Sequence, residues 1–311
     1  MPAFSLRSAF AAALLCAVSC PIARAQVQPA SPPTVVFIGN SFTFGAGSAV
    51  RFFRPSSVTD LNGEGIGGVP ALFNAFARQA GRNYAVSLET SGGKNFDWHL
   101  ENKAAVLGRA WDFVVMHGYS TLDQKKPGDP ALLVRSAGQL AALLHSKNPG
   151  VDIRLVATWS RADQVYPEKG AWHGQPIAQM ARDIRAAYDR AAAASPAIHA
   201  VIPVGEAWNR AMQTGVADPN PYDGIAFGQV DLWTHDHYHA SSYGYYLSAL
   251  MIFGDLTGLD PRSLGKNERA ALELGMSASQ AEALQKVAYD ELSATRGRPP
   301  LKAFQPVALP R

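Results

Sequence analysis

A serine that directly follows a buried strand is placed to act as a nucleophile. The run Thr34–Ile38 is short, apolar and continuous, which predicts a buried parallel strand, and Ser41 follows it after Gly39 and Asn40. A serine there stands at the carboxyl edge of the sheet, where backbone N–H groups can stabilise an oxyanion. Position alone favours a simple helix N-cap. The segment is also not a G-x-S-x-G nucleophile elbow, because Thr43 replaces the second glycine.

A base for this serine is expected near the other end of the chain. Segment 231–239 (DLWTHDHYH) holds three histidines and two aspartates. Asp236 and His239 are three residues apart, which lets the carboxylate accept the imidazole Nδ1–H while Nε2 faces outward. A serine activated by such a pair attacks acyl groups, so the spacing predicts nucleophilic catalysis.

Strands and helices alternate along the chain and would position these residues. Apolar runs predict five strands, at 34–38, 84–88, 112–116, 152–157 and 199–204. Helices are expected at 69–79, 101–109, 131–145, 177–194, 241–256, 267–274 and 279–292. This order predicts an α/β fold with a five-stranded parallel sheet, helices on both faces and a ligand site at the carboxyl ends of the strands.

The two ends of this pattern resemble the SGNH (GDSL-type) hydrolase superfamily. The G-N-S at 39–41 is similar to its first block, and the D-H-Y-H at 236–239 to its last. The resemblance spans roughly 34–256 and implies a flavodoxin-like, three-layer α/β/α fold. It also implies Ser41 as nucleophile, His239 as base and Asp236 as the partner that orients the base.

The middle blocks of the superfamily supply further oxyanion donors. The resemblance places the second-block glycine amide at Gly93, or alternatively Gly92, beside the amide of Ser41. The third block is normally G-x-N-D, but this chain has HGYS at 117–120 and no asparagine there. His117 or Ser120 is therefore expected to donate in place of the asparagine.

Aromatic residues near the expected strand ends indicate the substrate. Trp233 and Tyr238 flank the base, and we expect both to contact substrate, because such rings stack on sugar faces and acyl chains. Trp98 lies beside another such loop, whereas Trp159 is expected in the core.

These features together predict a serine esterase for small acyl esters, chiefly acetyl, on a small molecule or polysaccharide. One alternative is a lipase or thioesterase for longer acyl chains, with an apolar trough from Phe44, Phe52 and Phe53. Another is a non-catalytic carbohydrate-binding protein on the same fold.

We expect no metal, no cofactor and no nucleic-acid partner. The alternating His235, His237 and His239 would share one face of a strand, but the sequence offers no second ligand cluster beside them. The P-loop, the dinucleotide fingerprint and Asp-rich calcium loops are absent. A net charge of +3 gives no electrostatic footprint for nucleic acid.

The first 25 residues have the layout of a secretory signal. Arg7 precedes the apolar run Ala9–Val18, and an A-x-A site predicts cleavage after Ala25. The run is shorter than the ~20 residues of a membrane span. An alternative is a lipoprotein signal in which Cys20 is acylated. Cys16 and Cys20 are the two cysteines of the sequence. Cleavage after Ala25 would remove both and so excludes a cysteine nucleophile in the mature protein.

The expected organisation follows from these boundaries. We expect a signal peptide at 1–25, a linker at 26–33 and an SGNH hydrolase domain at 34–260. C-terminal helices and a Pro-rich tail follow at 261–311. The protein is expected to be periplasmic or secreted.

Overall fold

A sheet of parallel strands forms the centre of the computed structural model, which describes residues 1, 31–295, 297 and 299–307. The strands are β1 (Thr34–Gly39), β2 (Thr59–Asp60), β3 (Ala85–Thr90), β4 (Phe113–Met116), β5 (Asp152–Ala157) and β6 (Ile198–Pro203). Their order is β2-β3-β1-β4-β5-β6, and each pairing is parallel. The five predicted strands are confirmed. The sixth, β2, is a two-residue strand at the edge of the sheet.

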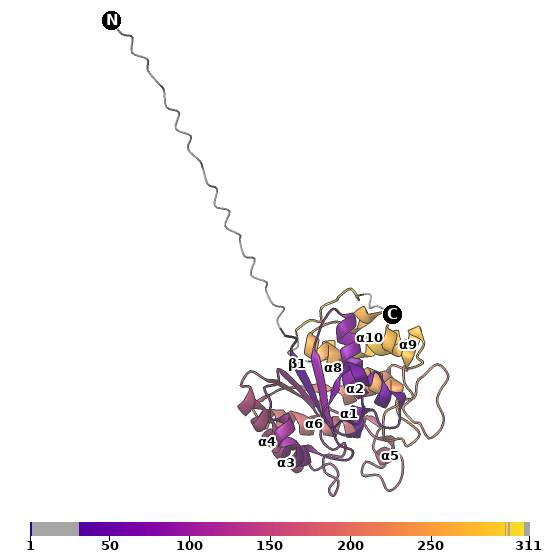
Figure 1. Ribbon diagram of the computed structural model, residues 1–311. Coiled ribbons are helices and arrows are strands. Elements are labelled where there is room, and N and C mark those ends of the chain that lie inside the picture. The colour runs from indigo at the N-terminus through magenta and orange to yellow at the C-terminus, as the bar shows by residue number, and fades with distance from the viewer. Residues whose placement is uncertain (2–30, 296, 298, 308–311) are drawn as a thin grey trace. The chain divides into compact units, whose positions relative to one another are not determined.

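Helices cover both faces of this sheet (Figure 1). One face carries α2 (Gly68–Gln79), α7 (Val204–Gln213), α8 (Ser242–Thr257) and α10 (Ala278–Ala294), and the other carries α3 (Phe96–Leu107), α4 (Ala131–Lys147) and α6 (Ala178–Ala194). Shorter elements are α1 (Ser41–Phe44), η1 (Ala49–Phe52), η2 (Pro55–Ser57), α5 (Ala162–Val165), η3 (Pro261–Leu264) and α9 (Arg269–Glu273). The predicted three-layer α/β/α fold is therefore confirmed.

Strand β1 reads as a continuous apolar run because both of its faces are buried. Val35 and Phe37 pack into the core beneath α2 and α8. Val36 and Ile38 pack into the opposite core beneath α3 and α4. Burial of each such side chain contributes roughly 1.5–3 kcal/mol, so β1 is a firmly held base for the loop that carries Ser41.

The C-terminal helices pack against the rest of the fold. Pro32–Arg311 forms one compact unit, in which α10 contacts α8. A capping box of Ser277 and Gln280 starts α10, and the Gln285 amide donates to the Tyr246 hydroxyl at 3.2 Å. The signal-like segment, its cleavage site and both cysteines lie outside the described residues, Met1 excepted.

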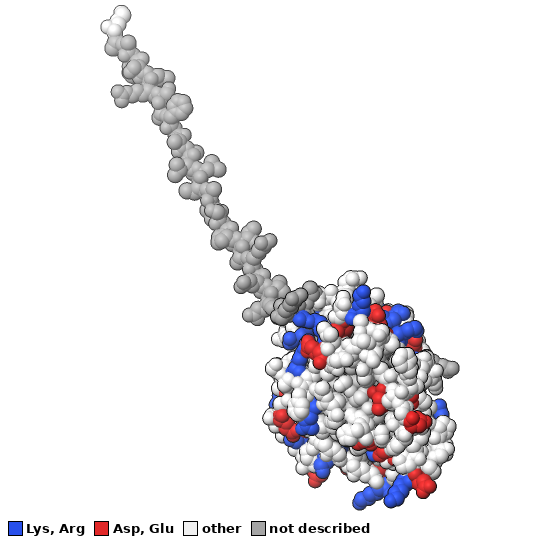
Figure 2. All heavy atoms as spheres, turned by 90° about the vertical axis from the view of Figure 1, so that its right-hand side faces the viewer, with Lys and Arg blue, Asp and Glu red and all other residues white. Residues whose placement is uncertain are grey.

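The surface carries both signs of charge. Figure 2 shows acidic and basic side chains scattered over one face, with broad areas of neither between them. In the described part of the chain, no helix is both long and apolar enough to cross a bilayer.

Two helical glycines give a matched test of the packing. A Cβ at Gly244 in α8 would lie 2.4 Å from the Leu232 carbonyl oxygen and 2.4 Å from Trp208 Cζ2, whereas a Cβ at Gly138 in α4 would meet nothing within 4 Å. We predict that Gly244→Ala destabilises the protein by about 1–3 kcal/mol through overpacking. Gly138→Ala should stabilise it by about 0.5–1 kcal/mol, because alanine is the better helix former. Urea denaturation measures both, and equal effects would contradict the close approach of α8.

Candidate active site

Ser41 is the first residue of α1, directly beyond the end of β1. Asn40 caps this turn, because its Oδ1 accepts from the amide of Phe42 at 3.2 Å. The Asn40 amide group also donates to the carbonyl oxygens of Lys94 at 3.1 Å and Gly118 at 3.0 Å. One side chain thus ties together the loops that follow β1, β3 and β4.

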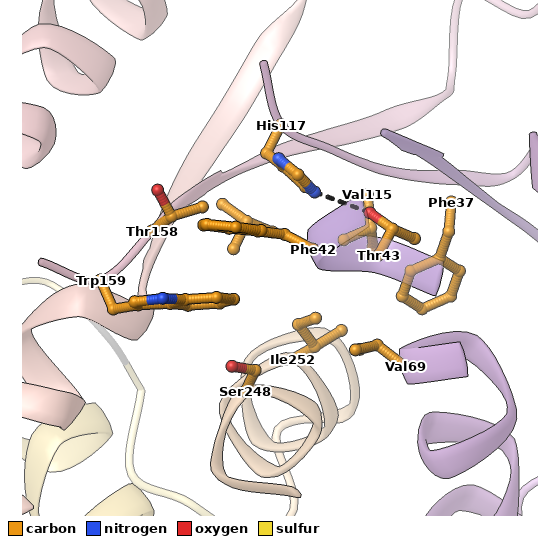
Figure 3. A pocket seen from close by; sticks show the side chains of 11 residues that line it. Phe37, Phe42, Thr43, Val69, Val115, His117, Thr158, Trp159, Ser248 and Ile252 are labelled. Atoms are coloured by element: carbon orange, nitrogen blue, oxygen red, sulfur yellow. Dashed lines mark hydrogen bonds between the residues drawn. The ribbon is translucent and has the colours of Figure 1, made fainter. Parts of the chain in front are cut away.

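The space beneath this turn is shaped by Gly39. A Cβ there would lie 2.3 Å from Thr43 Oγ1 and 2.8 Å from His117 Nε2. These two side chains hydrogen-bond at 2.7 Å, and Figure 3 shows both of them at a small cavity of about 20 Å³ between the sheet and α8. A side chain at position 39 would displace this pair.

Asp236 and His239 form the pair that their spacing predicts. His239 Nδ1 lies 2.6 Å from Asp236 Oδ2, while Oδ1 accepts from the Thr234 hydroxyl at 2.7 Å and from the amides of Tyr238 and His239 at 3.0 and 2.9 Å. Burial raises the pKa of Asp236, but these hydrogen bonds outweigh it and hold the pKa well below its ordinary value. The carboxylate therefore stays ionised, and the imidazole must carry its proton on Nδ1.

The other imidazole nitrogen remains open. His239 Nε2 is buried and has no hydrogen-bond partner among the described residues. The Phe42 ring, next in sequence to Ser41, lies 5.7 Å from the His239 ring between centroids. The structure thus places the His239 ring against the residue that follows Ser41, and among the described residues Ser41 and His239 form no hydrogen bond. In free enzymes this contact is often long and tightens only with substrate bound.

A stack of aromatic rings lies under both loops. Phe42 stacks on Trp159 at 4.0 Å and 11°, and Trp159 stacks on Trp208 at 4.7 Å and 5°. Trp233 meets Trp208 edge-on at 5.3 Å. The Trp159 indole N–H also donates to the Tyr238 carbonyl oxygen at 3.3 Å. The stack therefore joins the turn of Ser41 to the segment that carries the base.

His117 has no free donor for an oxyanion. Its Nδ1 lies 3.1 Å from the carbonyl oxygen of Gly118, which can only accept, so Nδ1 carries the proton. Burial lowers the pKa of His117 to about 4, so near neutral pH the ring is uncharged and Nε2 accepts from Thr43. Of the two alternatives for the third donor, the structure excludes His117.

Ser120 is held as a hydrogen-bond donor by Arg161. The Arg161 guanidinium lies 3.3 Å from Ser120 Oγ, and arginine can only donate, so the hydroxyl accepts there and keeps its own proton free. Within the described residues the buried Ser120 hydroxyl has no acceptor of its own. Arg161 also pairs with Asp163 and lies 3.5 Å from the centroid of the Tyr238 ring.

Three backbone amides are also open at this end of the sheet. The N–H of Ser41 starts α1 and so has no acceptor inside that helix. In the described part of the chain the amides of Gly93 and Gly92 bond to no acceptor either. Gly93 takes the left-handed conformation, with φ of 65°, which glycine adopts without strain.

The predicted substrate contacts need one correction. Trp233 is 1% exposed and donates to the Ser160 carbonyl oxygen at 3.0 Å, so it belongs to the core and does not face substrate. Tyr238 is partly exposed, and its ring lies 4.0 Å from the His239 ring between centroids, tilted by 34°. Trp159 is in the core, as expected. Both tryptophans sit in the aromatic stack, which sequence position alone does not reveal.

The three histidines of the base segment do not gather into a ligand set. The segment is a tight loop rather than a strand, closed by a bridge between Trp233 and Ala240, with His237 at a φ of 54°. The His237 ring lies 4.2 Å from the Tyr222 ring between centroids, tilted by 47°. Among the described residues no group of three or more potential metal ligands is found.

Three further residues were missed from the sequence. Thr234 stands two residues before Asp236, a spacing typical of a hydroxyl that bonds a loop aspartate. The side chain of Asn40, in the G-N-S block, has the two donors that join the loops after β3 and β4. Arg161 follows a different strand, and no local signal connects it to Ser120.

Known structures share this architecture, although neither protein-family models nor curated protein sequences give a match. A DUF4886 family protein from Bacteroides uniformis aligns with a TM-score of 0.58 at 18% identity, over 85% of this chain and 96% of its own. A "putative GDSL-like lipase" from Parabacteroides merdae aligns with a TM-score of 0.51 at 17% identity, over 73% of this chain and 95% of its own. At these identities the likeness concerns the fold.

Acid should destabilise the protein through His117. Its pKa is about 4 in the folded chain against 6.5 for a free imidazole, so the unfolded chain binds the proton first as pH falls from 6.5 to 4. The shift corresponds to a loss of up to about 3 kcal/mol across that window. We predict that His117→Gln removes much of this slope in urea denaturation between pH 7.5 and 4.5. His145→Gln, at an exposed site on α4, should keep it; equal slopes in the wild type and His117→Gln would refute the assignment.

Proposed function

Because the chain has the fold of the SGNH hydrolases, we propose that it is a serine ester hydrolase of that type. The observation that carries the proposal is the Asp236–His239 pair, whose Nε2 is unpartnered beside the turn of Ser41. An imidazole held by an ionised carboxylate and open on its other, buried nitrogen is the arrangement of a general base. This also disfavours a purely carbohydrate-binding role, which needs no such pair.

The proposed reaction proceeds through an acyl-enzyme. Ser41 Oγ attacks the ester carbonyl carbon while His239 Nε2 takes the hydroxyl proton, which gives a tetrahedral oxyanion. The oxyanion collapses, the ester C–O bond breaks, and the imidazolium returns the proton to the leaving alcohol. Water then attacks the acyl carbonyl carbon with His239 again as base, the bond from the acyl carbon to Ser41 Oγ breaks, Ser41 regains the proton, and the carboxylic acid leaves. Asp236 stays ionised throughout, as its lowered pKa requires, and stabilises the imidazolium.

Three groups are proposed to stabilise the oxyanion. The amides of Ser41 and Gly93 are the backbone donors, with Gly92 as the alternative to Gly93. The Ser120 hydroxyl, directed by Arg161, takes the place of the missing third-block asparagine. Fixed donors of this kind act without reorganising when the charge forms.

Small acyl groups, chiefly acetyl, are the proposed substrates, on a small molecule or carbohydrate. Of the three phenylalanines that would form an apolar trough, Phe44 and Phe53 are 8% and 6% exposed and lie in the core, whereas Phe52 is 67% exposed. The lipase alternative draws support from the "putative GDSL-like lipase" with this fold, but two of the three phenylalanines expected to form its trough are buried. Export from the cytoplasm is proposed from the signal-like pattern of residues 1–25.

Removal of the nucleophile or the base tests the reaction. We predict that Ser41→Ala and His239→Ala each reduce hydrolysis of 4-nitrophenyl acetate at least about 10³-fold, because members of a triad act as a unit. A fluorophosphonate probe should label the wild type and the exposed-site control Ser293→Ala, but not Ser41→Ala. Circular dichroism checks that each variant folds.

Two results would contradict this assignment. Labelling of Ser41→Ala at wild-type level would place the nucleophile elsewhere. Faster hydrolysis of octanoate than of acetate esters would favour the long-chain alternative.

The third oxyanion donor has its own test. We predict that Ser120→Ala lowers kcat about 10²–10³-fold, the range seen when one oxyanion donor is removed. Thr121→Val is the matched control, because the neighbouring hydroxyl already donates to the Asp123 carbonyl oxygen at 3.2 Å. Steady-state kinetics should show the loss in kcat for Ser120→Ala alone. A loss confined to KM would argue that Ser120 only helps to bind substrate.

A further inference from the structure

The side chain of Asn95 joins the loop after β3 to the loop after β4. Its Oδ1 accepts from the amide of Tyr119 at 3.2 Å. Its Nδ2 donates to Asp97 Oδ1 at 3.1 Å and to the Ser136 hydroxyl of α4 at 3.2 Å. Asn95 is fully buried, and none of the roles proposed above involves it.

The partners of Asn95 fix the orientation of its amide group. The Tyr119 N–H can only donate, so it faces Oδ1, whereas a carboxylate accepts, so Asp97 faces Nδ2. The Ser136 hydroxyl gives its own proton to the Leu132 carbonyl oxygen at 2.7 Å and therefore accepts from Nδ2. Both N–H groups of Asn95 are thus occupied, so Asn95 does not itself donate to an oxyanion.

Asn95 also occupies the N-cap position of α3 without capping the helix. Asparagine is favoured at this position because its side chain normally accepts from an amide of the first turn. Asn95 makes no such bond, and its side chain crosses to the loop after β4 instead. The helix thus gives up a stabilising contact in favour of the link between two loops. Departures of this kind from a local rule are typical of functional sites.

Gly118 leaves the room that this link needs. A Cβ at position 118 would lie 2.1 Å from Asn95 Oδ1 and 3.3 Å from Asn95 Cγ. Gly118 is not among the glycines with a positive φ, so its backbone conformation is open to other residues. The close approach of the Asn95 amide is therefore the reason for a glycine at this position.

We propose that Asn95 is a positioning residue for the oxyanion site, a proposal that rests on the proposed function. Gly93 lies two residues before Asn95, and Ser120 directly follows Tyr119. The bond from the Tyr119 amide to Asn95 therefore sets the separation of the two loops that carry these donors. Asn40 holds each loop to the turn after β1, whereas Asn95 holds the loops to each other. A displacement of about 1 Å in such a site can cost about 10²-fold in rate.

Kinetics of the full-length protein on 4-nitrophenyl acetate test this role. We expect Asn95→Ala to lower kcat about 10–100-fold with KM within about twofold of the wild type, because oxyanion donors act on charge that develops in the transition state. Asn74→Ala is the control, since it removes a buried amide on α2 that donates to the Ser57 carbonyl oxygen at 2.6 Å. It should keep the wild-type kcat. An unchanged kcat in Asn95→Ala, or a loss confined to KM, overturns the proposal.

A second variant reaches the same contact from the other side. The Cβ of Gly118→Ala would displace Asn95 Oδ1, so we expect a similar loss of kcat. In the double variant with Asn95→Ala the two losses should not multiply, because the amide that the Cβ displaces is already gone. Losses that multiply in full would overturn the link. Should Asn95→Ala not fold, a wild-type kcat in Gly118→Ala overturns the proposal.

Hydrogen exchange separates this proposal from the proposed function. Mass spectrometry of segments 91–95 and 117–121 reports on both loops without any substrate. We expect exchange at least about tenfold faster in both segments of Asn95→Ala, and at the wild-type rate in Asn74→Ala. Faster exchange in a protein that hydrolyses no ester would keep the link and overturn the hydrolase assignment. Unchanged exchange in Asn95→Ala would overturn the link, whether or not the protein hydrolyses esters.

Discussion

The stacked rings of Phe42, Trp159 and Trp208, with Trp233 against them, are the contact on which the site depends. Ser41 and His239 lie almost 200 residues apart, one at the start of the four-residue helix α1 and the other in a tight loop. Stacking places Phe42 on Trp159, and Trp159 also binds the carbonyl of Tyr238. Aromatic pairs of this kind contribute roughly 0.5–1.5 kcal/mol each beyond the area they bury. The loops that carry nucleophile and base are therefore both placed through the loop that follows β5.

Asn40 adds a second constraint, because its side chain links the backbones of separate loops. Its side chain satisfies two carbonyl groups and one amide from three segments. An unpaired buried carbonyl costs about 1–3 kcal/mol. Moving the loop after β3 or β4 away from Asn40 would leave such a carbonyl unpaired, and this cost holds both loops to the turn of Ser41. The open amide of Gly93 lies in one of these loops and the Ser120 hydroxyl in the other.

The sequence predicts well whatever is set by local pattern. Five apolar runs specify the strands, because a strand buried on both faces must be apolar throughout, and the i, i+3 spacing of Asp236 and His239 specifies their contact. The strand β2 was not predicted, because two residues are too few to show a hydrophobic pattern. Helix α7 was missed because it begins at Val204, directly after Pro203, with no loop to mark the boundary.

The direction of side chains in irregular segments could not be predicted from the sequence pattern. Trp233 lies within the base segment 231–239 yet points into the core, since a tight loop has neither the period of a strand nor that of a helix. The sequence alone does not distinguish His117 from Ser120 as the third oxyanion donor. Only the positions of the Gly118 carbonyl, Thr43 and Arg161 separate them, and two of these three come from other elements of the fold.

The pairing of Ser120 with an arginine has a consequence for how the site responds to its surroundings. A guanidinium keeps its charge at any pH at which a protein folds, so the donor state of this hydroxyl is constant. Backbone amides do not titrate either. Under the proposed roles, the half of the site that stabilises negative charge is therefore insensitive to acidity.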